Sequence, residues 1–214
     1  MHRQGFRRSA IRVYDRALGP HQVPRTARAA FRSLRPGTLA VDCGANVGAV
    51  TALLAARGAD VVAYEPNPFA YAVLAETFAG NPHVRCLPKA VAATAGTALL
   101  HSHREAAADQ LRWSTGSSLV AGKPNVDPAQ AVTVETVDLE TELAALGRRV
   151  NVLKLDVEGT EVEILERLLA TGRLLEIDHV LVELHDLPGL STRVAALRER
   201  LSAPEYRHVR LDWT

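Results

Sequence analysis

Short apolar runs alternate with segments of helical spacing along most of this chain. Five runs have the length of a buried strand and are bounded by turn or polar residues: residues 39–43, 61–65, 84–87, 150–155 and 179–184. Elsewhere apolar residues recur three and four positions apart, as in amphipathic helices, over residues 49–57, 68–78, 160–170 and 191–201. This alternation predicts a doubly wound α/β fold of Rossmann-like type, with a mostly parallel sheet.

The pattern is weaker in the middle of the chain and at its end. We expect an additional strand at 97–101, a strand at 131–137, a short helix at 141–146 and a final strand at 206–211. Residues 101–128 are rich in polar and turn residues. A long irregular segment in a compact domain is typically a functional lid or an insertion. We therefore expect a lid or insertion at about 101–128, with His101 and His103 on the surface.

Arginine is concentrated at the N-terminus, where the first 35 residues contain nine arginines and one acidic residue. Four apolar residues there follow an approximately helical stripe: Phe6, Ile11, Tyr14 and Leu18. We interpret residues 1–35 as a basic N-terminal helical arm that packs on a domain spanning residues 36–214. The alternative is a nucleic-acid-binding module built on this arm. The other 16 basic and 23 acidic residues, and an aromatic content of 5%, oppose it. We expect no nucleic-acid partner.

The composition is that of an ordinary globular domain, with 47% hydrophobic and 23% charged residues among 214. No apolar run approaches the roughly 20 residues that a membrane-spanning helix needs, so we expect no membrane span. The N-terminus lacks the apolar core of a signal peptide, which predicts a cytoplasmic location. The two cysteines, Cys43 and Cys86, offer neither a disulfide framework nor the spacing of zinc ligands.

The most informative motif follows the first strand, where Asp42 precedes a turn that contains Gly44, Asn46 and Gly48. Glycine has no Cβ atom, so it adopts positive φ angles and allows a ligand to approach the backbone closely. Glu65 ends the next strand, 23 residues after Asp42. An acidic residue at about this distance holds the nucleotide ribose in doubly wound domains. The sequence therefore predicts a cofactor that contains a nucleoside.

The residues around this motif extend the predicted cofactor site. Asn67 either contacts the nucleoside or caps the helix that begins at Pro68, and Pro66 lies beside it in the same turn. Asp42 either organises the glycine turn and meets the positive end of the cofactor, or acts as a helix-capping residue. Lys89 and Ala90 come just after the third strand, and we place them near the cofactor as well.

Two acidic groups follow later strands, and the carboxyl ends of parallel strands meet at the edge of the sheet where ligands bind. Asp156 and Glu158 could orient an amino group of the cofactor, bind Mg²⁺ through oxygen ligands or accept a proton. Acids that favour a helix N-terminus are the simpler alternative. Lys154 precedes them in the predicted strand, where successive side chains alternate between the two faces of the sheet. We expect its side chain to point outward and to be structural.

His185 is the candidate general base, since the ordinary pKa of histidine lies near working pH. It follows Glu183 at the end of a predicted strand, and a loop residue that only forms hydrogen bonds is the alternative. Ser117 and Ser118, in the irregular segment, either line the acceptor site with Glu183 or form a turn.

These segments together resemble the FkbM-type methyltransferase family, a branch of the class I enzymes that use S-adenosylmethionine (SAM). The resemblance covers roughly residues 38–186, and its most specific part is the run from Lys154 to Gly159. The matching motifs are residues 41–48, 64–68, 89–91, 116–119, 134–139, 153–161 and 182–185. The turn spacing, Gly-x-Asn-x-Gly after Asp, also resembles the SAM loop of class I methyltransferases rather than a dinucleotide loop.

The resemblance implies methyl transfer to a hydroxyl of a sugar or secondary metabolite. It implies that the glycine turn holds the methionine end of SAM, Glu65 the ribose and residues 87–91 the adenine. Asp156, Glu158 and His185 would face a small-molecule acceptor, with Mg²⁺ as an optional second cofactor. The alternatives are an NAD(P)-dependent reductase and a SAM-binding protein without turnover. A homo-oligomer is compatible with the sequence.

Overall fold

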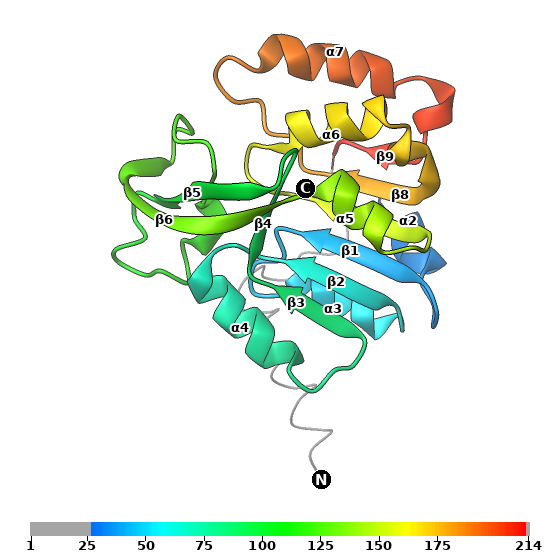
Figure 1. The fold of residues 1–214 in the computed structure, drawn as a ribbon, viewed down its shortest axis with the longest axis horizontal. Coiled ribbons are helices and arrows are strands. Elements are labelled where there is room, and N and C mark those ends of the chain that lie inside the picture. The colour runs from blue at the N-terminus through cyan, green and yellow to red at the C-terminus, as the bar shows by residue number, and fades with distance from the viewer. Residues whose placement is uncertain (1–26, 213–214) are drawn as a thin grey trace.

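The computed structural model describes residues 27–212, and the predicted helical stripe of residues 6–18 lies outside them. A six-stranded sheet forms the centre, and all its neighbouring strands are parallel. Its order is β3-β2-β1-β7-β8-β9. The bounds are β1 Leu39–Cys43, β2 Asp60–Tyr64, β3 Val84–Leu87, β7 Val150–Leu155, β8 Ile177–Val182 and β9 Val209–Arg210. The predicted doubly wound, mostly parallel α/β fold is confirmed (Figure 1).

The strand order reverses between β1 and β7. Strands β2 and β3 extend the sheet on one side of β1, and β8 and β9 extend it beyond β7. Doubly wound sheets bind ligands outside the carboxyl ends of the strands at such a switch point. Asp42 in β1 pairs in register with Lys154 in β7, so these side chains lie next to each other at this point.

Helices cover both faces of the sheet, which explains why its strands are continuous apolar runs. The helices that pack on one face are α5 Leu139–Ala145, α6 Glu161–Ala170 and α7 Ser191–Leu201 (Figure 1). Those on the other face are α2 Arg28–Ser33, α3 Ala49–Ala56 and α4 Pro68–Phe78. Two short 3-10 helices, η3 Arg173–Glu176 and η4 Pro204–Tyr206, lead into β8 and β9. Tyr206, the first residue of the predicted final strand 206–211, therefore lies in a helical turn, and the strand is limited to Val209–Arg210.

A second sheet has three strands in the order β4-β6-β5, with β4 parallel and β5 antiparallel to β6. Its strands are β4 Lys89–Ala92, β5 Gly96–His103 and β6 Val126–Asp138. The sequence did not predict β4, because four residues after Pro88 show no periodicity. The predicted strand at 131–137 begins five residues earlier, at Val126, because its first half pairs with the end of β5 in an antiparallel ribbon.

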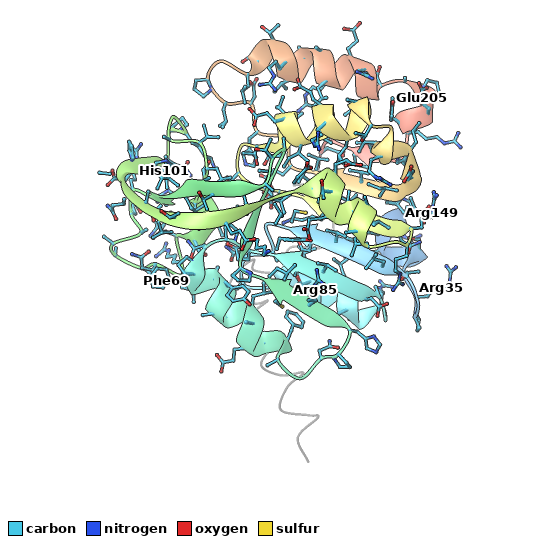
Figure 2. The ribbon with its side chains drawn as sticks, viewed as in Figure 1. Arg35, Phe69, Arg85, His101, Arg149 and Glu205 are labelled. Carbon is cyan, nitrogen blue, oxygen red and sulfur yellow. The ribbon has the colours of Figure 1, made fainter. Side chains whose placement is uncertain are left out.

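The segment expected to be an irregular lid connects β5 to β6. Residues 104–125 contain turns and the 3-10 helix η2 Ser114–Gly116. His101 lies in the second sheet (Figure 2), where it is buried with 7% of its surface exposed. The expectation that His101 lies on the surface is therefore wrong. His103 is half-buried and stacks on Trp113, with ring centroids 4.4 Å apart. Within residues 27–212, no helix is long and apolar enough to cross a membrane.

Candidate functional site

The glycine loop, residues 44–48, connects β1 to α3 and has the predicted backbone conformation. Gly44, Asn46 and Gly48 have φ angles of 77°, 48° and 92°. A Cβ atom on Gly44 would lie 1.8 Å from the carbonyl oxygen of Asp156. One on Gly48 would lie 2.7 Å from the ring of Phe78. The close approach that requires glycine is thus made by the protein itself, which packs this loop against β7 and α4.

Glu65 holds the glycine loop from the end of β2. Its Oε2 accepts a hydrogen bond from the backbone N–H of Asn46 at 2.7 Å, and its Oε1 accepts one from Asn67 at 2.8 Å. The carboxyl is 5% exposed, and burial raises its pKa to about 7 although the two N–H groups lower it. Each carboxylate oxygen can accept a second hydrogen bond, so Glu65 remains able to receive hydroxyl donors.

Asn67 is a helix cap, as one of the two predicted alternatives proposed. Its side-chain oxygen accepts hydrogen bonds from the backbone N–H groups of Phe69 and Ala70 at the start of α4. Its amide nitrogen donates to Ser117 at 2.9 Å, and that of Asn46 donates to Ser114 at 2.9 Å. The segment between β5 and β6 is therefore tied to the glycine loop through Ser114 and to the start of α4 through Ser117. Pro66 is half-buried in the same turn.

Asp42 lies fully buried behind the glycine loop. Its Oδ2 accepts a hydrogen bond from Thr51 of α3 at 2.6 Å, and its Oδ1 lies 3.5 Å from the amine of Lys154. The same amine lies 3.1 Å from Asp156 and donates to the carbonyl oxygen of Gly44 at 2.7 Å. Burial alone would lower the pKa of Lys154, but Asp156 and Asp42 together raise it.

The prediction that Lys154 points outward is wrong. The sheet has helices on both faces, so alternation along β7 has no solvent side, and Lys154 is 3% exposed. Its amine joins the glycine loop to the acidic residue after β7.

On the other side of Lys154 lies a group of charged side chains that we call the His185 cluster: Lys123, Asp156, Glu158, Glu161, Glu183 and His185. The Nε2 of His185 is 3.2 Å from Glu158, and its Nδ1 is 3.0 Å from Glu161. Lys123, from the segment between β5 and β6, forms an ion pair with the same oxygen of Glu158. Glu183 is farther away, 3.9 Å from His185.

The backbone helps to shape this cluster. Glu158 has a φ angle of 63°, in the left-handed region that side-chain-bearing residues seldom adopt. Its carbonyl oxygen accepts a hydrogen bond from Ser118 at 2.6 Å. The two serines predicted for the acceptor wall thus contact different regions, because Ser117 meets Asn67 and Ser118 meets Glu158. Burial, followed by Asp156, raises the pKa of Glu183.

The cluster contains a set of atoms that could surround a cation. One ligand atom from each of Asp156, Glu158 and His185 lies within 4.8 Å of the others. However, Lys154 already pairs with Asp156, and Lys123 pairs with Glu158. Because these ammonium groups supply positive charge to both carboxylates, the residues fit Mg²⁺ poorly, an ion that prefers oxygen ligands and bound water.

The structure does not place every predicted residue at the switch point. Lys89 begins β4 and its amine pairs with Glu135 of β6 at 2.6 Å. Ala90 is buried between the strands of the second sheet, beside Leu100 and Val134. The other predicted site residues lie in the glycine loop, in the turn after β2 or in the His185 cluster, or contact one of these through Ser117 and Ser118.

Sequence reasoning missed Lys123 and Glu161, and it misplaced Lys154. One signal was available for the lysines. The chain contains 22 arginines but only three lysines, at positions 89, 123 and 154. Two of these three are buried beside carboxylates at the switch point. An ammonium group is a compact charge with three donors, whereas guanidinium is a planar fork, so the two are not interchangeable at such a site.

The fold defines a Rossmann-like α/β protein with a group of charged and polar side chains at the switch point of its sheet. Residues 42–209 match the model of the methyltransferase FkbM domain. The chain therefore belongs to the FkbM family of methyltransferases, and the predicted family resemblance is confirmed.

A characterised relative is the hexuronic acid methyltransferase AglP of Haloferax volcanii, which is 28% identical over 147 residues. The match covers 67% of this chain and 54% of that protein, so the chain spans about half of the relative's length. Among solved structures, the chain is similar to a TehB-like SAM-dependent methyltransferase from Corynebacterium glutamicum, with a TM-score of 0.28 and 20% identity. That match covers 39% of this chain and 44% of the other, and so partial a likeness carries no argument.

Proposed function

We propose that this protein is a SAM-dependent O-methyltransferase that methylates a hydroxyl of a sugar or a sugar-containing secondary metabolite. The observation that carries the proposal is the arrangement at the switch point. There the glycine loop with Glu65 adjoins a histidine held between two carboxylates, within a member of a methyltransferase family. Family membership also favours methyl transfer over the reductase alternative.

The glycine loop and Glu65 would hold the methyl donor. Backbone N–H groups fix the carboxylate of Glu65, and its free lone pairs suit the two hydroxyls of a ribose. The loop would contact the methionine end of SAM, and Asp156 would receive its amino group. Of residues 87–91, Leu87 would lie near the adenine, since its carbonyl oxygen accepts a hydrogen bond from the N–H of Glu65.

The His185 cluster would bind and activate the acceptor. In methyl transfer the acceptor oxygen attacks the methyl carbon in line with the departing sulfur. The new C–O bond forms as the C–S bond breaks, and the sulfur keeps the electron pair. Nε2 of His185 would take the proton from the hydroxyl. The main tasks of the protein are to align the two reactants and to remove this proton.

The acceptor side favours a substrate rich in hydroxyl groups. Asp156, Glu158 and Glu183 present carboxylates, which accept hydrogen bonds from sugar hydroxyls. The positive charge that faces them comes from Lys123 and Lys154, both of which already have carboxylate partners. A carboxylate on the acceptor would therefore be repelled by the carboxylates of the protein. We expect neutral glycosides to be better acceptors than glycosides of a uronic acid, although the matched relative is a hexuronic acid methyltransferase.

Calorimetry with S-adenosylhomocysteine tests the donor half of the proposal. We expect binding by the wild-type protein, a strong loss of affinity in Glu65→Ala, and no change in Glu76→Ala, which alters an exposed glutamate of α4. Absence of binding in the wild type would refute SAM dependence. Unchanged affinity in Glu65→Ala would remove Glu65 from the ribose site.

The acceptor half is tested by transfer of a labelled methyl group from SAM to matched glucosides and glucuronides, with and without a chelator. We expect the glucosides to react faster and the chelator to have no effect, since no step of the proposed reaction uses a metal ion. Loss of activity in the chelator, restored by Mg²⁺, would contradict this. A preference for glucuronides would overturn the charge argument.

A further inference from the structure

We propose that Glu161 is the positioning residue of His185, fixing the ring so that Nε2 carries the free lone pair in the acceptor site. The inference rests on the proposed function, in which His185 takes the acceptor proton. Glu161 is the first residue of α6 and is fully buried, although a glutamate is costly to bury without partners. Neither the predicted donor site nor the predicted catalytic set includes it.

The carboxylate of Glu161 is held in one orientation by the backbone. Its Oε1 accepts hydrogen bonds from the N–H groups of Val157 and Gly159 at 3.0 and 3.1 Å. Its Oε2 accepts a further bond from Gly159 at 3.0 Å. A carboxylate fixed in this way is a rigid acceptor. Its other hydrogen-bond partner is Nδ1 of His185, which lies 3.0 Å from Oε1.

This contact determines which nitrogen of the neutral ring carries the proton. An ionised carboxylate only accepts hydrogen bonds, so Glu161 favours a proton on Nδ1, whereas Glu158 would favour one on Nε2 but already has Lys123 as a donor. Nε2 then keeps its lone pair and lies on the side of Glu158, 3.2 Å from its Oε2. The side chain of His185 is 17% exposed, whereas that of Glu161 is not exposed at all. Nε2 can therefore meet a substrate while Nδ1 is anchored in the protein.

Lys123 completes the arrangement from the opposite side. Its amine pairs with the oxygen of Glu158 that is near Nε2, so this oxygen has a donor other than the histidine and competes less for the proton of the neutral ring. The charged groups that face His185 are Glu161, Lys123, Asp156, Glu158 and Glu183. Burial alone would lower the pKa of His185, but the hydrogen bond and the charge of Glu161 outweigh it and raise the pKa.

A different role must be distinguished from this one. Glu161 could serve only to fix the backbone of residues 157–159, in which case its loss would disturb the site whether or not His185 were present. If Glu161 acts through His185, its loss should matter only while His185 is there. A double-mutant cycle separates these two cases.

The kinetic experiment compares Glu161→Gln, His185→Ala and the double variant, with Glu163→Gln as the control. Glu163 lies two residues further along α6, with 54% of its side chain exposed. We expect Glu161→Gln to lower kcat by about 100-fold, the lower end of what a general base contributes. In the His185→Ala background it should have less than about a twofold effect. Losses that multiply independently would overturn the proposal, as would full activity of Glu161→Gln.

A spectroscopic experiment tests the positioning without requiring turnover. Nitrogen NMR of the wild-type protein bound to S-adenosylhomocysteine, above the pKa of His185, should show the tautomer protonated at Nδ1. Glu161→Gln should shift the population toward Nε2–H, and Glu163→Gln should not. An Nε2–H tautomer in the wild type would overturn the proposal even if Glu161→Gln fails to fold. The expected tautomer in a protein without methyltransferase activity would instead retain the positioning role and refute the proposed function.

Discussion

The glycine loop and the His185 cluster adjoin each other at the switch point, yet they are built in different ways. The loop is fixed by the backbone. Gly44 packs against the carbonyl of Asp156, and backbone N–H groups fix Glu65. In the cluster, backbone N–H groups hold Glu161, but the other contacts are ion pairs among side chains, including one from Lys123 in a distant segment of the chain. The proposed donor site is thus built mainly by the backbone, and the proposed acceptor site mainly by charged side chains.

Lys154 is the element that belongs to both regions. It contacts Asp42 and Gly44 on the side of the loop and Asp156 on the side of the cluster. Oδ1 of Asp42 is buried and has no hydrogen-bond partner among the described residues, so the charge of Lys154, 3.5 Å away, is what compensates it. One buried cation, Lys154, therefore connects the two regions.

Of the substitutions considered, removal of the Lys154 charge should have the largest effect on stability and binding. Lys154→Met keeps the approximate volume but leaves Asp42 and Asp156 without a positive partner. Breaking a buried ion pair by deleting one member typically costs about 3–5 kcal/mol. We expect a loss of this size in the free energy of unfolding measured with urea, together with loss of S-adenosylhomocysteine binding.

Lys89→Met is the matched control, because Lys89 pairs with Glu135 while remaining 30% exposed. Exposed pairs contribute only about 0–1 kcal/mol. Equal losses in the free energy of unfolding of the two variants would show that Lys154 does not join the two regions.

The difference between backbone-built and side-chain-built regions also explains which features could be predicted from the sequence. The strand before the loop, Leu39–Cys43, and the helix Pro68–Phe78 were predicted at their exact bounds, because glycine, proline and apolar runs encode backbone locally. The spacing of Glu65 from Asp42, which predicts its place at the end of the second strand beside the glycine loop, is also a local pattern. Local patterns do not encode the pairing of Lys123 with Glu158, which requires a segment 35 residues away to fold back.

The error at Lys154 has a similar origin. Alternation along a strand separates two faces, but only the tertiary structure shows whether a face is covered. Glu161 was hidden in another way. An acidic residue in the first turn of a helix normally stabilises the helix dipole from the surface, and nothing local shows that this one is buried beneath His185.

A pair of glycines tests whether the loop depends on backbone packing. Gly44 and Gly172 have nearly the same φ angle, 77° and 76°, but a Cβ atom on Gly172 would have nothing within 4 Å. Both substitutions to alanine incur the backbone strain of about 1–2 kcal/mol. Gly44→Ala also forces a clash with Asp156, which adds about 1–3 kcal/mol. We expect urea denaturation to show this difference, and only Gly44→Ala to lose S-adenosylhomocysteine binding. Similar stability and binding in both variants would contradict backbone packing of the loop.

The smallest expected effect is the pH dependence that Glu65 gives to the loop. Its pKa is raised by burial to about 7, above the roughly 4.3 of an exposed glutamate. Between these values the folded protein holds a proton that the unfolded chain releases. This contribution to stability is therefore complete below the lower value and is lost as the pH rises through about 7.

Binding of the donor should respond to pH with the opposite sign. Ribose hydroxyls donate hydrogen bonds to the ionised carboxylate, so the affinity for S-adenosylhomocysteine should fall by up to about tenfold per pH unit below the pKa. Calorimetry across this range measures the slope, and Glu65→Gln, which cannot titrate, should give a flatter line and lose the pH-dependent stability. Parallel slopes in the two proteins would show that Glu65 only supports the loop. The backbone-built region would then owe its recognition of the donor to the N–H groups and carbonyls of the loop alone.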